Sequence, residues 1–321
     1  MSNNVNVLLI GAGRMAEFYC EVFKGMNIVP MIVGRGSANA KALTEKTGFE
    51  VLEGGIEKAY DLLPYEPTHV IIATGVETLL KTTEFILKKG IKNILLEKPG
   101  ALNLAELETL NNLSEQFNAQ IRIAYNRRFY SSVKKAQEII EEDGGLVSIN
   151  YEFTEWSHVI KDSHQTSEVK ENWLLANSTH VIDLAFYFAG APIELSAYTK
   201  GKLDWYSKAA AFAGAGITEK DVLFTYQANW EAPGRWGLEL LTKKHRLYLR
   251  PMEQLSMQDI GSVQVYPVEI EDEIDKKYKP GLYEQVESFV NLTDDERTIY
   301  LQEHVQHVKW YEAIEGVDVQ N

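Results

Sequence analysis

The fold of this chain is indicated most strongly by residues 5–16, which read Val5-Asn6-Val7-Leu8-Leu9-Ile10-Gly11-Ala12-Gly13-Arg14-Met15-Ala16. Their apolar run is typical of a buried parallel strand, and the residues that follow have a helical pattern. Between strand and helix stands G-x-G-x-x-A, in which Gly11 permits a tight turn, Gly13 lets the backbone approach a pyrophosphate and Ala16 allows close helix–strand packing. The pattern therefore predicts a dinucleotide-binding turn, with the phosphates at the helix N-terminus.

Strand and helix patterns alternate over the first 120 or so residues. Strands are expected at 5–10, 28–34, 69–73, 93–96 and 120–125, and helices at 15–26, 37–46, 77–89 and 104–117. Each connection between strands is long enough for a helix, so the sheet should be parallel and doubly wound. We expect an α/β dinucleotide-binding Rossmann domain over residues 1–125.

The pattern changes after residue 125. A connecting helix at 129–142 precedes alternating segments at 146–156, 193–200, 209–213, 222–230, 236–242 and 246–250, which carry one internal helix at 173–188. The chain ends in helical patterns at 283–290 and 296–313. This predicts an α+β domain over residues 126–321, with a large, mostly antiparallel open sheet and a helix on one face.

The composition limits the partners and the compartment. The net charge of 32 − 46 = −14 disfavours nucleic acid and anionic membranes as partners. No apolar stretch approaches the roughly 20 residues that span a bilayer, and Met1 leads into a strand without a signal peptide. The single cysteine, Cys20, fits a reducing compartment. We therefore expect a cytoplasmic protein without a membrane partner.

Glu97-Lys98-Pro99 directly follows the apolar run at 93–96. The tripeptide therefore stands at the carboxyl end of a predicted strand, where open α/β sheets bind ligands. A lysine there, followed by a proline that ends the strand, aims an ammonium group into a cleft. The tripeptide alone would fit a solvated loop, but the glycine turn upstream favours a site.

Five short motifs, in order and at familiar spacing, make the chain resemble the glucose–fructose oxidoreductase/inositol dehydrogenase (Gfo/Idh/MocA) family. They are Gly11-Ala12-Gly13-Arg14-Met15-Ala16, Ile71-Ile72-Ala73-Thr74, Glu97-Lys98-Pro99, Tyr125-Asn126-Arg127-Arg128-Phe129 and His180-Val181-Ile182-Asp183. The resemblance implies an NAD(P)-dependent oxidoreductase that acts on the hydroxyl or carbonyl group of a sugar, a cyclitol or a sugar derivative, which could be nucleotide-linked. It also implies a substrate pocket between the Rossmann domain and the open sheet, and a homodimer or homotetramer formed through that sheet.

The resemblance also implies roles for individual residues. Lys98 would polarise the reacting carbonyl, and His180 would carry the proton at neutral pH. On spacing alone, His180 fits a buried core histidine, and the resemblance favours catalysis. Cofactor binding is assigned to Gly11, Gly13, Arg14, Met15, Arg35, Ser37, Ala73, Thr74, Glu97 and Lys98, and substrate binding to Asn126, Arg127, Asn177 and Asp183.

One departure from the family pattern concerns the acid four residues before the histidine. That position is Ala176, with Asn177 beside it. An amide hydrogen-bonds a substrate hydroxyl but does not shuttle protons. Either Lys98 and His180 suffice, or another residue supplies the acid, or the substrate is not an ordinary polyol. The departure keeps an alternative open, a catalytically weak NAD(P)-binding sensor or regulatory protein of the same fold.

The nicotinamide is expected to be NADP, with NAD as the second choice. Rossmann domains that bind NAD usually place an acid at the end of the second strand, on the ribose hydroxyls. The segment from Ile32 to Lys41 has no acid and offers Arg35, Ser37 and Lys41 instead. A guanidinium and a hydroxyl suit a 2′-phosphate, although Arg35 could also stack on adenine or face solvent.

Two further groups of residues have competing interpretations. Trp230, Arg235 and Trp236 offer aromatic planes for a sugar ring and a guanidinium for a phosphate or carboxylate, but tryptophans in a sheet more often pack or form an interface. His304 and His307 are three residues apart on the last helix, where a solvated face is favoured over a metal site. No metal site is expected.

Overall fold

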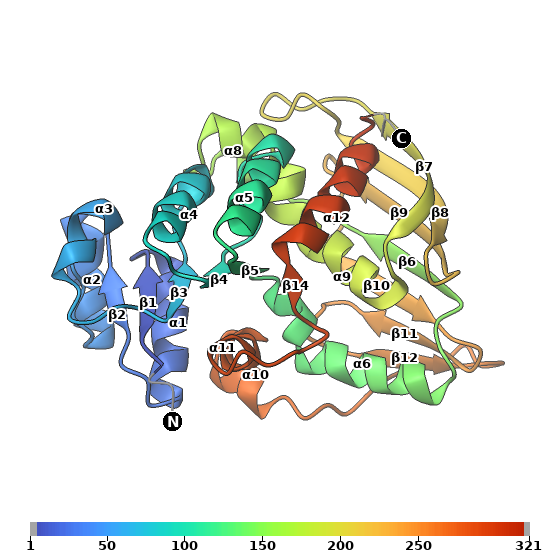
Figure 1. Cartoon of the computed structure of the whole chain (residues 1–321). Coiled ribbons are helices and arrows are strands. Elements are labelled where there is room, and N and C mark those ends of the chain that lie inside the picture. Colours follow the sequence, from blue (N-terminus) through green and yellow to red (C-terminus); the bar gives the residue numbers. More distant parts are fainter. Residues whose placement is uncertain (1–4, 318–321) are drawn as a thin grey trace. The chain divides into compact units, whose positions relative to one another are not determined.

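The computed structural model describes residues 5–317 and divides the chain into two compact units (Figure 1). The first unit extends to Asn126 and also contains Ile274–Val305, while the second contains Arg127–Glu273 and the chain from Gln306 onward. The structure divides the chain after Asn126 and returns Ile274–Val305 to the first unit, whereas we expected a single boundary at residue 125.

The first unit is built on a six-stranded sheet in the order β14-β5-β4-β3-β1-β2. Its strands pair in parallel except at the edge, where β14 is antiparallel to β5. They are β1 (Val7–Ile10), β2 (Met31–Val33), β3 (His69–Ile72), β4 (Asn93–Leu96), β5 (Gln120–Ile123) and β14 (Ile299–Tyr300). β1, β2 and β3 are buried along their whole length, as expected of parallel strands covered on both faces. The predicted doubly wound α/β fold is confirmed.

The helices of this unit begin and end close to the predicted positions. They are α1 (Arg14–Gly25), α2 (Ser37–Thr47), α3 (Ile56–Ala59), α4 (Leu79–Lys88), α5 (Leu104–Gln116) and α11 (Leu282–Val290), with short 3₁₀ segments at Tyr60–Leu62 and Val76–Thr78. α11 returns to the unit because Leu282, Val286 and Phe289 join the same apolar core as Val7 and Phe23. This long-range burial holds a segment from near the end of the chain in the first unit.

The second unit contains an eight-stranded sheet in the order β13-β12-β11-β10-β6-β9-β8-β7. Neighbouring strands are antiparallel except β6 and β9, which are parallel. The strands are β6 (Ser148–Glu152), β7 (Pro192–Lys200), β8 (Ala211–Thr218), β9 (Leu223–Asn229), β10 (Gly237–Leu241), β11 (His245–Leu249), β12 (Ser256–Asp259) and β13 (Val265–Pro267). The predicted α+β class is confirmed, and the two short strands β12 and β13 extend the sheet beyond the prediction.

The two faces of this sheet differ in chemistry. α9 (Thr179–Ala189) packs on β6 and β10, and α6 (Ser131–Glu142) packs on β11 (Figure 1). The covered face is aromatic, and it includes Tyr151, Phe153, Phe212, Phe224 and Tyr226. Alternate positions on β6, β9 and β10 carry polar side chains, among them Asn150, Glu152, Thr225, Gln227 and Glu239. The homo-oligomer expected through this sheet stays a prediction.

The segment before α9 is more helical than expected. The polar segment 157–172 holds two short helices, α7 (Ser157–Lys161) and α8 (Ser167–Glu171). The helix expected over 173–188 begins with a π-helical turn at Leu174–Ser178 and continues as α9. A π turn accommodates an extra residue and is frequent at functional sites. Among residues 5–317, no helix is long and apolar enough to cross a membrane.

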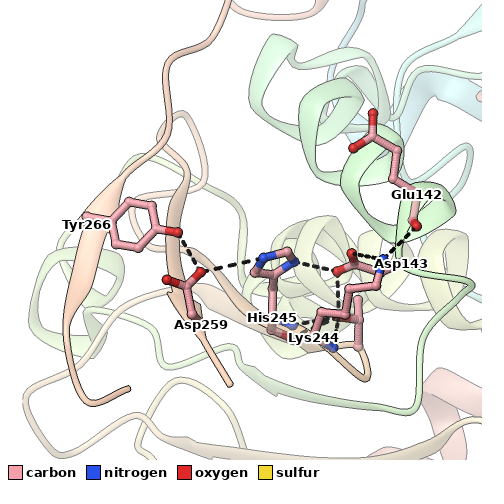
Figure 2. Close-up of polar contacts among 7 residues, drawn as sticks. Glu142, Asp143, Lys244, His245, Asp259 and Tyr266 are labelled. Atoms are coloured by element: carbon pink, nitrogen blue, oxygen red, sulfur yellow. Dashed lines mark hydrogen bonds and ion pairs between the residues drawn. The ribbon is translucent and has the colours of Figure 1, made fainter. Parts of the chain in front are cut away.

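A polar network joins the end of α6 to the outer strands of the sheet (Figure 2). Asp143 Oδ2 accepts a hydrogen bond from Thr242 Oγ1 at 2.7 Å and lies 2.6 Å from His245 Nδ1. His245 Nε2 lies 3.5 Å from Asp259 Oδ1, to which Tyr266 Oη donates at 2.6 Å. The carboxylate of Asp143 thus links a helix terminus to the turn between β10 and β11.

We expect Asp143→Asn to lower the free energy of unfolding at neutral pH by about 1–3 kcal/mol. Burial alone would raise the pKa of Asp143, but hydrogen bonds from Thr242 and His245 outweigh it and lower the pKa below its usual value. A depressed pKa contributes stability above the unfolded-state pKa of about 4, and this stability is lost as the pH falls through the folded-state pKa. Urea unfolding at neutral pH and at a pH of about 3 measures the effect.

The matched control is Asp61→Asn, which removes a carboxylate that is 85% exposed and pairs with Lys89 at 3.3 Å. Exposed pairs contribute little, so this variant should stay close to wild type at both pH values. Equal losses in the two variants would show that the network around Asp143 does not stabilise the second unit.

Candidate functional site

A cavity of about 660 Å³ lies in the first unit at the end of β1 and the start of α1. Gly11 has a φ of +132°, and a Cβ there would come within 2.2 Å of the Ala73 carbonyl oxygen. Gly13 is the N-cap of α1, no side chain caps this helix, and a Cβ at Gly13 would meet nothing within 4 Å. A dinucleotide-binding site must hold a pyrophosphate, and this open space beside the uncapped helix amides fits one.

The predicted cofactor residues divide into two groups. Gly11, Gly13, Arg35, Ala73 and Thr74 all line this cavity. The lining does not include Arg14, Met15, Ser37, Glu97 or Lys98. Six further polar side chains, which were not among the predicted cofactor residues, also line the cavity: Asn39, Glu57, Lys58, Thr78, Lys81 and Thr82. Glu57 and Lys81 come from α3 and α4, and their Oε1 and Nζ atoms lie 3.9 Å apart.

The turn that carries Lys98 is held by contacts on both sides of the lysine. Glu97 is half-buried, and its Oε1 accepts a hydrogen bond from Tyr19 Oη on α1 at 2.7 Å. Burial raises the pKa of Glu97. Beyond the lysine, the Pro99 carbonyl oxygen accepts a hydrogen bond at 2.9 Å from Nε2 of His304, a residue of α12 (Leu301–Ile314). These contacts fix the backbone of the turn at the carboxyl end of β4.

The prediction that His304 and His307 lie on a solvent-exposed face is wrong. Both side chains are buried, because His304 binds the Pro99 carbonyl and His307 packs edge-on against Phe186 with ring centroids 5.3 Å apart. Throughout residues 5–317, no group of three or more His, Cys, Asp and Glu side chains is placed to hold a metal ion.

In the second unit, Arg128 and Asp183 form a buried two-pronged ion pair. Arg128 Nε donates to Asp183 Oδ2 and its second terminal nitrogen donates to Oδ1, each at 2.8 Å. The side chains are 3% and 1% exposed. We expected Asp183 to bind substrate, but both of its oxygens anchor α9 to the turn at Asn126–Phe129. In the first unit, Asn126 is likewise buried, and its amide donates to the Pro280 carbonyl at 2.9 Å. These contacts do not support a substrate role for either residue.

Glu155, which was not among the predicted site residues, lies beyond the end of β6 next to the start of α9. The side chain is 2% exposed, and burial raises its pKa. Glu155 Oε1 accepts hydrogen bonds from Asn177 Nδ2 at 3.0 Å and from Ser178 Oγ at 2.8 Å, and Oε2 accepts one from Arg235 at 3.1 Å. An acid from another element therefore contacts the residue beside Ala176. The signal in the sequence was an acid at the end of the alternating segment 146–156.

His180 lies on α9 in the same region. Its side chain is buried, and its ring centroid lies 5.9 Å from that of Trp236. Arg127, which we expected to bind substrate, has its guanidinium 4.9 Å from the same indole. Arg235 pairs with Glu155 and lies 4.3 Å from the Trp236 ring centroid, so it links the Glu155–Asn177 pair to His180 and Arg127. Asp183 stays in the ion pair with Arg128.

Comparison with known proteins agrees with the Rossmann fold of the first unit. Residues 5–125 match the model of a family described as an oxidoreductase family with an NAD-binding Rossmann fold. No curated protein matches the chain in sequence. Among solved structures, an oxidoreductase from Agrobacterium radiobacter in complex with NAD⁺, L-tartaric acid and magnesium is 13% identical, with a TM-score of 0.80 and 99% of each chain covered.

Two other solved structures have named substrates. A UDP-N-acetylglucosamine 3-dehydrogenase from Acidithiobacillus ferrooxidans is 12% identical, with a TM-score of 0.75 and 97% of this chain and 96% of the other covered. A levoglucosan dehydrogenase in complex with NADH and L-sorbose is 18% identical, with a TM-score of 0.76 and 99% of each chain covered. At these identities the likeness shows that the fold is shared.

Proposed function

We propose that this chain, whose residues 5–125 match the Gfo/Idh/MocA oxidoreductase family model, moves hydride between NADP(H) and a hydroxyl or carbonyl carbon of a sugar, a cyclitol or a sugar derivative. The observation that carries the proposal is the cavity where Gly11 and Gly13 leave room beside the uncapped amides of α1. The neighbours with L-tartaric acid, L-sorbose or a UDP-sugar as named ligand or substrate support the substrate class.

Four residues of this chain have separate roles in the proposed hydride transfer: Lys98, His180, Asn177 and Glu155. When bound, the nicotinamide supplies or accepts the hydride. Lys98 stabilises negative charge on the reacting oxygen, and His180 holds and exchanges its proton. Asn177 positions a substrate hydroxyl, and Glu155, which accepts from its amide, fixes the orientation of that amide. The contacts of Tyr19 and His304 hold the turn that carries Lys98.

The test is the absorbance of NADPH in the presence of keto-sugars, cyclitol ketones and nucleotide-linked keto-sugars, together with the reverse assay on the corresponding alcohols. We expect oxidation of NADPH with at least one of these classes. A protein that binds NADPH but responds to none of them would instead fit a catalytically weak sensor.

The proposed cofactor preference rests on Arg35, which lines the cavity. We expect the wild-type protein to bind NADPH more tightly than NADH, because Arg35 lines the cavity and the segment around it has no acid. Arg35→Ala should lower the affinity for NADPH by about tenfold or more, which is the scale of a hydrogen bond to a charged group. The affinity for NADH should stay unchanged. Fluorescence titration with both cofactors measures this.

Lys46→Ala is the matched control, since Lys46 is a cation in α2 that pairs with Glu17 and does not line the cavity. This variant should keep the wild-type preference. Equal affinities for the two cofactors in the wild type, or a parallel loss of both in Arg35→Ala, would contradict the assignment of NADP.

A further inference from the structure

The cavity at the N-terminus of α1 concentrates positive charge on an acidic protein. Among the described residues that line it, the charged ones are three cations and one acid, namely Arg35, Lys58, Lys81 and Glu57. Their net charge is +2, whereas the whole chain carries −14. A local excess of one sign in a cavity attracts ligands of the opposite sign. The wall of this cavity therefore favours an anion in addition to the pyrophosphate that the helix amides can bind.

The acid balances only one of the three cations. Glu57 Oε1 lies 3.9 Å from Lys81 Nζ, so these two charges form a pair on the cavity wall. Over residues 5–317, no carboxylate pairs with Arg35 or with Lys58. Two of the cations are therefore available to a ligand without breaking an ion pair of the protein.

Backbone contacts place Arg35 and Lys58 on adjoining segments of the first unit. The Gly55 amide donates to the Gly34 carbonyl oxygen at 3.0 Å. Arg35 directly follows Gly34, and Lys58 comes three residues after Gly55, within α3. The stem of Lys58 lies along Gly54, where a Cβ would come within 3.6 Å of Lys58 Cδ, and Gly54 itself lines the cavity. The two cations thus approach one wall of the cavity from two segments that are held together.

The end of β2 indicates which part of a dinucleotide these cations would meet. β2 ends at Val33, two residues before Arg35. Rossmann domains recognise the 2′ position of the adenosine ribose at the end of this strand, through an acid for a hydroxyl or an arginine for a phosphate. A phosphomonoester carries a charge of about −1.5 to −2 at pH 7, which two cations match. A ribose hydroxyl carries no charge and needs neither of them.

We propose that Arg35 and Lys58 together form a subsite for the 2′-phosphate of NADP, which makes Lys58 a second specificity-determining residue for the cofactor. The planar guanidinium binds two phosphate oxygens, and the ammonium group supplies the second charge. Glu57 stays paired with Lys81 and leaves the ribose hydroxyls alone. The inference rests on the proposed function for the presence of a nicotinamide cofactor, but binding of a 2′-phosphate requires no turnover.

The test measures binding to the full chain by titration calorimetry. The probes are 2′,5′-ADP, 5′-AMP and inorganic phosphate, together with NADP⁺ and NAD⁺. We expect 2′,5′-ADP to bind about tenfold to a hundredfold more tightly than 5′-AMP, and NADP⁺ to exceed NAD⁺ by a similar factor, because hydrogen bonds to charged groups are worth about tenfold each. Inorganic phosphate should bind about tenfold or more weakly than 2′,5′-ADP, since it lacks the adenosine.

Lys58→Gln should lower the affinity for 2′,5′-ADP and NADP⁺ by about tenfold and leave 5′-AMP and NAD⁺ unchanged. Lys58→Arg keeps the charge and should lose less. The double variant Arg35→Ala with Lys58→Gln should bind NADP⁺ and NAD⁺ equally. The matched control is Lys88→Gln, because Lys88 lies in α4, pairs with Glu84 at 2.6 Å and does not line the cavity. This variant should bind as the wild type does, and the thermal unfolding midpoint confirms that each variant is folded.

Several outcomes would overturn the subsite. They are equal affinity for 2′,5′-ADP and 5′-AMP in the wild type, parallel losses of both in Lys58→Gln, or equal losses in the Lys58 and Lys88 variants. A selective loss of NAD⁺ binding in Glu57→Gln would also overturn it, because that acid would then hold the ribose hydroxyls.

Failure of the subsite and failure of the proposed function give different results. If Lys58→Gln selectively weakens 2′,5′-ADP but no keto-sugar or cyclitol ketone oxidises NADPH, the subsite stands and the dehydrogenase proposal fails. If the protein oxidises NADH as well as NADPH and Lys58→Gln changes the affinity for neither, hydride transfer stands and the subsite fails.

Discussion

Lys98→Met and His180→Ala are each expected to lower turnover by about 10²–10⁴-fold, the usual scale for groups that move protons or stabilise charge. NADPH should still bind to both variants, because neither residue lines the cavity at the N-terminus of α1. Steady-state rates with the best substrate, together with NADPH fluorescence titration, separate the loss of chemistry from a loss of cofactor binding.

Two matched variants control for the removal of a charge or an imidazole. Lys92→Met removes a lysine at the opposite end of β4, and His164→Ala removes an exposed histidine of the second unit. Both should keep near-wild-type rates. If Lys98→Met and His180→Ala also turn over at near-wild-type rates, the proton and charge roles proposed for these residues are wrong.

The glycine turn and the parallel strands could be predicted because their signals are local. An apolar run, a turn that tolerates only small residues and a helix follow each other within residues 5–16, and the structure places β1, the Gly11 turn and α1 there. Asn93–Leu96 is a strand as predicted. Its position explains why Glu97-Lys98-Pro99 stands at a strand end.

The return of the chain to the first unit could not be predicted from local pattern. β14 is only two residues long, and it forms because it pairs with the edge of β5, far away in sequence. The helical pattern near residue 283 predicts that α11 has an apolar face. It does not predict that this face packs into the core of the first unit. A strand or helix stabilised by distant partners has no local signal for its location.

The site shows the same limit. Spacing placed His304 and His307 on one face of a helix, but the burial of that face depends on the Pro99 carbonyl for His304 and on Phe186 for His307. Spacing likewise could not find Glu155, which meets Asn177 across 22 positions of the chain. Pairings of this kind are set by the tertiary structure. The sequence shows that position 176 has no acid, but it does not show that Glu155 contacts the neighbouring Asn177.

Asp183→Asn is expected to lower the free energy of unfolding by about 3–5 kcal/mol, because it leaves the buried guanidinium of Arg128 without the carboxylate that binds it. The amide has nearly the same size, so the loss reports charge and hydrogen bonding rather than a cavity. α9 also carries His180, so turnover should fall with stability. Chemical denaturation of the wild type and the variant measures the difference.

The pair Arg250–Glu152 provides the control, since Arg250 is 49% exposed and the ion pair is of the same chemical type. Arg250→Gln should cost less than about 1 kcal/mol. The double variant Arg128→Met with Asp183→Leu removes both charges and should recover much of the stability lost in Asp183→Asn, because neither buried charge then lacks its partner. A loss below about 1 kcal/mol in Asp183→Asn would instead mean that Arg128 does not need this carboxylate, and Asp183 would again be available for a role in substrate binding.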